Sequence, residues 1–219
     1  MSTIPWPVAV RWARSIQERV IESAERVAIV GSIRREKEQV GDIELLIEPT
    51  MRVEQGDLFS QGPRPDTQGV VEELLGQDSG RSVIKGGSRY VQMRLAGDAV
   101  QGETKLDLFF CHPPASWGAL KVIRTGPSDL GRLIVTELRE RGWRMKDGAI
   151  WCPRDMLYHL QTTDLEVCPN KGREIEGVPY ERVSTPEEED VFEAVGLEYV
   201  PPERRDELAE TLERRAAES

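Results

Sequence analysis

Two acidic side chains and a glycine-serine bend are the residues whose types and spacing could do chemistry. Asp42 and Glu44 lie two residues apart in an apolar, strand-like run, so the two-residue period of a strand places both carboxylates on one face. Gly31 and Ser32 follow a β-branched run that ends at Val30. Glycine permits a sharp turn there, and serine opens a helical turn whose amides and hydroxyl can receive an anion. Together the two features indicate metal-dependent chemistry on a phosphate compound.

A third acid, Asp107, stands in the alternating segment 105–110. Three carboxylates on neighbouring strands supply the oxygen ligands that Mg²⁺ prefers. A pair of ions would let one activate an attacking hydroxyl while the other neutralises a triphosphate. Any one of these acids taken alone is more often a solvent-facing residue of a half-exposed strand, but the bend upstream favours a metal site. We therefore expect Asp42, Glu44 and Asp107 to be catalytic and to bind two Mg²⁺ ions, with Mn²⁺ as a substitute.

Several segments together resemble the nucleotidyltransferases of the polymerase beta superfamily and, within them, the family X DNA polymerases. The segments that carry the resemblance are Gly31-Ser-Ile-Arg-Arg35, Gly41-Asp-Ile-Glu44, Asp107, Trp117-Gly-Ala-Leu120, Arg124-Thr-Gly126, 185–192 and 196–204. The similarity covers most of residues 8–206. It implies a DNA polymerase-type nucleotidyltransferase, which adds nucleotides from nucleoside triphosphates to the 3′ hydroxyl of a nucleic-acid primer and releases pyrophosphate.

The same resemblance implies a binding site for the nucleoside triphosphate. The expected substrate-binding residues are Gly31, Ser32, Arg35, Thr125, Gly126 and Arg132. The first three would hold the β and γ phosphates, while Arg132 would lie on the template side. Primer or gapped DNA is the expected second substrate.

The sequence departs from the family pattern at several positions. Glu44 stands where aspartate is more common, and Ile123 and Arg124 replace a Tyr-Phe pair that packs beside the sugar. Gly131 and Val135 replace an asparagine and an arginine that contact the base pair and the template. Two alternatives therefore stay open: a template-independent or non-DNA nucleotidyltransferase of the same superfamily, and a catalytically silent nucleic-acid-binding module.

Charge and composition restrict the partners. The chain has 29 Lys and Arg against 39 Asp and Glu, a formal net charge of -10, whereas general duplex binding brings a basic surplus. Many acids gather in 187–190 and 202–219, so the site itself can still be basic. Cys111, Cys152 and Cys168 are widely spaced and give no zinc pattern. The chain shows neither a membrane-length apolar run nor a signal-like start, so we expect a cytoplasmic monomer without membrane contact, with a protein partner left open.

The pattern of elements predicts an α/β (α+β) fold. The expected parts are a nucleotidyltransferase palm with a mixed sheet flanked by helices (1–114), a smaller thumb-like α+β domain (115–206) and an acidic helical tail (207–219). We expect the 30 residues before Gly31 to be too few for the lyase and helix-hairpin-helix modules of larger family X enzymes. We expect them to form an amphipathic helix over 5–25 instead. Its expected apolar face consists of Val8, Trp12, Ile16, Val20 and Ile21.

Further elements follow from periodicity and turn residues. In the palm we expect a helix at 70–75 and strands at 27–30, 42–47, 90–95 and 105–110. In the thumb we expect helices at 115–124 and 129–141 and a hairpin with its turn at 146–148. Residues 153–183 look like an insertion with a short helix near 156–160. Residues 50–82 and 153–183 carry no motif to which we assign a role.

Overall fold

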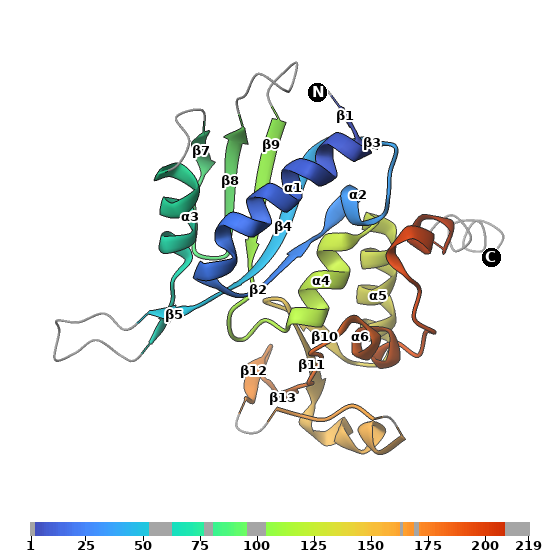
Figure 1. Ribbon diagram of the computed structural model, residues 1–219. Helices are drawn as coiled ribbons and strands as arrows, with labels where there is room; N and C mark the ends of the chain where they lie inside the picture. The colour runs from blue at the N-terminus through green and yellow to red at the C-terminus, as the bar shows by residue number, and fades with distance from the viewer. Residues whose placement is uncertain are drawn as a thin grey trace, which may run out of the picture. The chain divides into compact units, whose positions relative to one another are not determined.

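Figure 1 shows the computed structural model, which describes residues 3–52, 63–76, 81–95, 104–162, 164–168 and 171–208. The chain divides into two compact units, Met1–His112 and Pro113–Ser219. The expected acidic tail lies outside the described residues beyond Leu208.

A five-stranded mixed sheet forms the centre of the first unit, in the order β2-β4-β9-β8-β7. Its strands are β2 (Ala24–Ile29), β4 (Asp42–Pro49), β9 (Thr104–Phe110), β8 (Tyr90–Leu95) and β7 (Arg81–Lys85). The central pair, β4 and β9, is parallel, and the other neighbours are antiparallel. The parallel register sets Asp42 opposite Lys105 and Glu44 opposite Asp107.

The two faces of this sheet differ because side chains alternate along each strand. Ile43, Leu45 and Ile47 point to one face, where they join the hydrophobic core. Helices α1 (Trp6–Val20) and α3 (Thr67–Gly76) cover that face (Figure 1). The polar side chains that alternate with the core residues on β4, β9 and β8 therefore face the other way.

Helix α1 packs on the sheet as predicted, but with a different apolar stripe. Its buried residues are Ala9, Ala13, Ile16 and Val20. The two alanines allow the helix backbone to approach its neighbours closely. Ile21, which we placed on the apolar face, is 59% exposed, because the helix gives way there to a 3₁₀ turn, η1 (Ile21–Ser23). Pro7 lies in the first turn of the helix, where its missing N–H costs nothing.

A short helix and two short strand pairs complete the described part of the first unit. Helix α2 (Gly31–Arg34) follows β2 directly. Strand β1 (Ile4–Pro5) pairs with β3 (Gln39–Val40), and β5 (Met51–Arg52) pairs with β6 (Arg64–Pro65).

The second unit combines helices with a four-stranded antiparallel sheet in the order β10-β11-β13-β12. The strands are β10 (Arg144–Lys146), β11 (Ala149–Pro153), β12 (Arg173–Ile175) and β13 (Val178–Arg182). The helices are α4 (Trp117–Thr125), α5 (Ser128–Glu140) and α6 (Glu188–Ala194), with 3₁₀ helices η2 (Arg154–Thr162) and η3 (Pro202–Arg204). No helix in the described part of either unit is long and apolar enough to cross a membrane.

Strand pairing in the second unit confirms one prediction and corrects another. The β10–β11 hairpin turns at Asp147 and Gly148, whose φ angles of 53° and 74° fit the two-residue turn that we predicted. The insertion predicted at 153–183 is wrong, because β13 pairs with β11 and β12 pairs with β13. The short helix expected within it is η2.

A buried ion pair joins the C-terminal segment to α6. Arg205 Nη1 lies 2.9 Å from Glu188 Oε1, and the two side chains are 0% and 2% exposed. Arg205 Nε also donates to the Val200 carbonyl at 2.9 Å. The guanidinium lies 5.3 Å from the Phe192 ring centre and 5.7 Å from that of Tyr199. One cation thus ties this segment to the core of the unit.

Removing the carboxylate of this pair should destabilise the protein strongly. We expect Glu188→Ala to lower the free energy of unfolding by about 3–5 kcal/mol, because Arg205 would remain as a buried, unpaired charge. Urea denaturation measures the change. The exposed neighbour Glu189 supplies the control, and a loss no larger than that of Glu189→Ala would contradict the assignment. The double variant Glu188→Leu/Arg205→Met should lose less than Glu188→Ala, because both charges leave the core.

Candidate active site

The glycine-serine bend lies where β2 meets α2. The Val30 amide donates to the Glu44 carbonyl at 3.0 Å, which joins the end of this segment to β4. Gly31 has a φ of +68°, a conformation that favours glycine. A Cβ at this position would lie 1.6 Å from Glu44 Oε2. The Glu44 carboxylate therefore lies directly against the bend, and both backbone and space require glycine there.

The Ser32 hydroxyl is the group at this bend that is ready for a ligand. Its oxygen is buried and has no hydrogen-bond partner among the described residues. A buried polar group left unsatisfied costs about 1–3 kcal/mol, so an oxygen-rich ligand at this point would be stabilising. Arg35 follows as the C-cap of α2, where its amide donates to the Gly31 carbonyl at 3.3 Å.

The three acids predicted from the sequence share one face of the sheet. Asp42 and Glu44 alternate with buried residues on β4, and Asp107 does so on β9. Glu44 and Asp107 are paired across the parallel strands. Asp107 is only 8% exposed. The carboxylates are thus neighbours on two central strands beside the bend.

Two residues of β8 that we did not single out from the sequence contact Asp107. Tyr90 Oη donates to Asp107 Oδ1 at 3.0 Å, and Gln92 Nε2 donates to the same oxygen at 2.9 Å. The alternation of Tyr90 and Gln92 with Val91 and Met93 was the available signal, because it places two polar side chains on one face of a predicted strand. Their distance from Asp107 depends on strand pairing, which alternation does not specify.

Asp42 is partly buried and has two charged neighbours, Asp107 and Lys105. Burial raises the pKa of its carboxyl above the ordinary 3.8, and the negative charge of Asp107 raises it further. Lys105, which lies opposite Asp42 in the register, partly offsets this rise in pKa. The charged form of Asp42 is therefore unfavourable at this position, and a cation bound nearby would relieve the cost.

The three carboxylates lie on neighbouring strands, but they do not converge on one position where a metal ion could sit. Among the described residues, no three Asp, Glu, His or Cys side chains are placed so that they could hold a metal ion. Like charges repel, Glu44 lies against Gly31, and Asp107 Oδ1 is held by donors on β8. The donor set itself suits Mg²⁺, which prefers oxygen ligands. The two-ion site at Asp42, Glu44 and Asp107 therefore stays a prediction.

The predicted substrate-binding residues of the second unit lie at and after the α4–α5 turn. Thr125 ends α4 and is fully buried, and Gly126 caps the helix with a φ of +71°. A cis peptide bond leads from Gly126 to Pro127. Arg132 is exposed on α5 and forms an ion pair with Asp129. Their roles toward nucleotide and template stay predictions.

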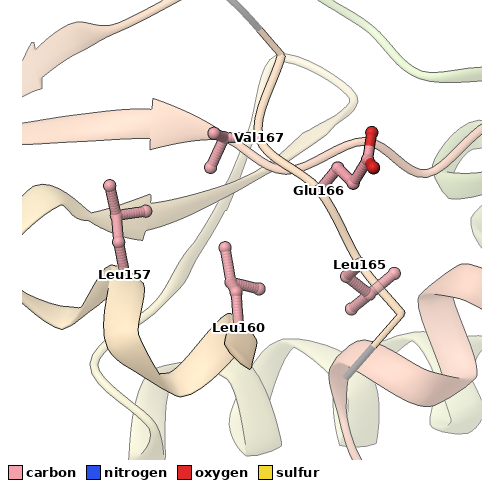
Figure 2. A pocket seen from close by; sticks show the side chains of 5 residues that line it. All are labelled: Leu157, Leu160, Leu165, Glu166 and Val167. Atoms are coloured by element: carbon pink, nitrogen blue, oxygen red, sulfur yellow. The ribbon is translucent and has the colours of Figure 1, made fainter. Parts of the chain in front are cut away.

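A pocket of about 390 Å³ lies beside η2 in the second unit. It is lined by Leu157, Leu160, Leu165, Glu166 and Val167. Figure 2 shows the Glu166 carboxylate turned away from Leu157. Apolar side chains and a single carboxylate provide no donor for a phosphate group, so this pocket does not fit a triphosphate.

Comparisons with known proteins show similarity in the fold and in the second unit. Residues 122–206 match the family described as DNA polymerase beta thumb. Two solved structures of Leishmania infantum polymerase beta, a ternary gap complex and a ternary P/T complex, each match with a TM-score of 0.67 and 18% identity. The matches cover 94% of this chain and 71% and 77% of the respective Leishmania chains. A comparison with curated proteins finds no match.

The fold is therefore that of polymerase beta, with a mixed sheet flanked by helices in the first unit and a thumb in the second. These matches confirm the resemblance carried by the sequence motifs. The chain is thus similar to family X polymerases in its fold and in the thumb segment 122–206.

The close approach of Glu44 to Gly31 can be tested by adding one methyl group at position 31. Gly31→Ala should lower the free energy of unfolding by about 1–3 kcal/mol, because alanine is strained at positive φ and its Cβ displaces Glu44. The matched control is Gly41→Ala, where a Cβ meets nothing within 4 Å. Urea denaturation compares the two variants. Equal stability of both would contradict the close approach of Glu44 to the bend.

The raised pKa of Asp42 predicts a pH-dependent stability. Protonated Asp42 is favoured in the folded state, so its contribution to stability is complete below the unfolded pKa and is lost as pH rises through the raised folded pKa. In metal-free buffer, Asp42→Asn should therefore be more stable than the wild type at neutral pH. The difference should vanish in acid. Unfolding measured across pH checks this, and a less stable Asp42→Asn at neutral pH would contradict it.

Proposed function

We propose that this protein is a compact polymerase of the family X type, which acts as a monomer and adds nucleotides from nucleoside triphosphates to the 3′ hydroxyl of primer or gapped DNA. The polymerase beta fold and the thumb match support a polymerase-type function. The observation that carries the proposal is the pairing of Glu44 with Asp107 beside the bend at Gly31, where Glu44 Oε2 fills the space of a Cβ.

The residues present fit divalent metal ions. Three carboxylates offer oxygen ligands. Burial, and after it the charge of Asp107, raises the pKa of Asp42, and a bound cation would compensate this cost of the charged form. Asp42 and Glu44 would hold the ion on the nucleotide side, and Asp107 would join them at a second ion. When bound, Mg²⁺ or Mn²⁺ would make the 3′ hydroxyl a better nucleophile and neutralise charge on the phosphates.

The chain itself supplies position and charge compensation. The Ser32 hydroxyl, buried without a partner among the described residues, would donate to a phosphate oxygen of the incoming nucleotide. Arg35, one residue after α2, would place its guanidinium near the β and γ phosphates. The primer 3′ oxygen then forms a bond to the α phosphorus as the bond to pyrophosphate breaks.

In the second unit, Gly126 would contact the nucleotide at the α4–α5 turn, with the fully buried Thr125 behind it, and Arg132 would meet the template. One observation favours template-independent transfer as a second candidate. Gly131 and Val135, on either side of Arg132 in α5, have no side-chain hydrogen-bond donor or acceptor to offer a template strand.

Primer extension with and without a template strand tests the proposal. We expect the wild type to extend a labelled primer in Mg²⁺ or Mn²⁺, and to do so faster on template. Asp107→Ala should reduce incorporation by roughly 100- to 1000-fold, as loss of an electrostatic contact in an active site does.

Glu48→Ala supplies the control for this experiment. Glu48 lies on β4, on the same face as Glu44 but further along the strand. Its carboxylate forms an ion pair with Arg26 at 3.3 Å. This variant should keep full activity. Undiminished incorporation by Asp107→Ala would reject the assignment, and equal rates with and without template would favour the second candidate.

A further inference from the structure

Asp107 is held from one side by its neighbouring strand. Gln92 stands directly opposite Asp107 in the antiparallel β8–β9 pair, and Tyr90 stands opposite Phe109, two residues further along β9. Both side chains donate to Oδ1, at 2.9 Å from Gln92 and 3.0 Å from Tyr90. Neither Tyr90 nor Gln92 donates a hydrogen bond to the other carboxylate oxygen of Asp107, Oδ2. The carboxylate is thus held by one of its two oxygens.

The direction of these bonds fixes the rotation of the carboxylate. β8 lies on one side of β9, and β4 with Glu44 lies on the other. Because both donors come from β8, they engage Oδ1 and leave Oδ2 as the oxygen that neither donor occupies. Hydrogen bonds to a carboxylate are among the stronger ones in proteins, so this orientation is well defined.

The donors are themselves held in place. The Tyr90 ring stacks on the Phe109 ring, with ring centres 5.2 Å apart and an interplanar angle of 23°. The backbone of Gln92 is fixed by the β8–β9 pairing, which sets this residue directly opposite Asp107. A rigid donor pair can set the orientation of a ligand side chain more closely than mobile surface groups can.

We propose that Tyr90 and Gln92 are positioning residues, which turn Asp107 so that Oδ2 is presented to a divalent cation and the reacting 3′ hydroxyl. This inference rests on the proposed function. Neither residue touches the substrate, and both act through Asp107. Partners of this kind behind a metal ligand commonly change metal affinity or activity by 10- to 100-fold.

The test uses two variants that remove the donors and keep the shape. Tyr90→Phe keeps the stacked ring, and Gln92→Met keeps the side-chain length. We expect each to weaken Mn²⁺ binding by about 10-fold or more, measured by electron paramagnetic resonance without nucleotide or DNA. In primer extension, kcat should fall by a similar factor. KM for the nucleoside triphosphate should stay unchanged, because the expected phosphate contacts come from the bend at 31–35.

Two controls separate positioning from general damage. Tyr158→Phe changes a tyrosine that is 57% exposed on η2, and Gln68→Met changes a glutamine of α3 that bonds Glu72. Both should bind Mn²⁺ as the wild type does. In an Asp107→Ala background, Tyr90→Phe and Gln92→Met should cause no further loss of Mn²⁺ affinity, because the residue through which they act is gone.

The outcomes distinguish this inference from the proposed function. If the wild type extends primers and Asp107→Ala does not, but Tyr90→Phe and Gln92→Met match the wild type in Mn²⁺ affinity and kcat, only the positioning role is overturned. An equal loss of affinity in the Asp107→Ala background overturns it as well, since the effect then bypasses Asp107. If the wild type neither binds Mn²⁺ nor extends primers, the proposed function fails and this inference fails with it.

Discussion

Crowding of negative charge on one face of a mixed sheet is the constraint on which the rest of this structure depends. Asp42, Glu44 and Asp107 lie on two neighbouring strands, and burial together with Asp107 raises the pKa of Asp42. Such an arrangement costs stability unless a cation compensates it. The bend at Gly31 lets the Glu44 carboxylate pack against backbone, and the buried Ser32 hydroxyl lies in the same turn. The site therefore has an electrostatic cost that ligand binding would offset.

The opposite face of the sheet makes this arrangement possible. Ile43, Leu45 and Ile47 lie in the core under α1 and α3, so β4 has only one register that keeps them buried. A slip of one residue would bury the carboxylates and expose the core, because side chains alternate along a strand. The hydrophobic face thus fixes the acids on the other face. The same two-residue period of the strand therefore determines which side chains are buried in the core and which face carries the acids.

Much of this could be predicted from the sequence, and the rest depends on contacts between distant segments. Alternation correctly placed the strand at 90–95 and put Asp42 and Glu44 on one face. The contact between Glu44 and Gly31 and the donors to Asp107 arise from strand pairing, which local patterns do not encode. The expected insertion at 153–183 failed for the same reason, since β13 finds its partner across 25 or more residues of chain in β11. Alternation in 105–110 singled out Asp107, and the family resemblance supplied the long-range information that alternation lacks.

Anomalous diffraction from crystals soaked with Mn²⁺ and a non-hydrolysable nucleoside triphosphate tests the central claim most directly. Manganese scatters anomalously, so its position is determined independently of the protein atoms. The account predicts manganese bound by Asp42 and Glu44, with an oxygen of Asp107 bound to manganese on the same face. Manganese absent from this face, or bound there while Asp107 stays beyond bonding distance, would contradict it.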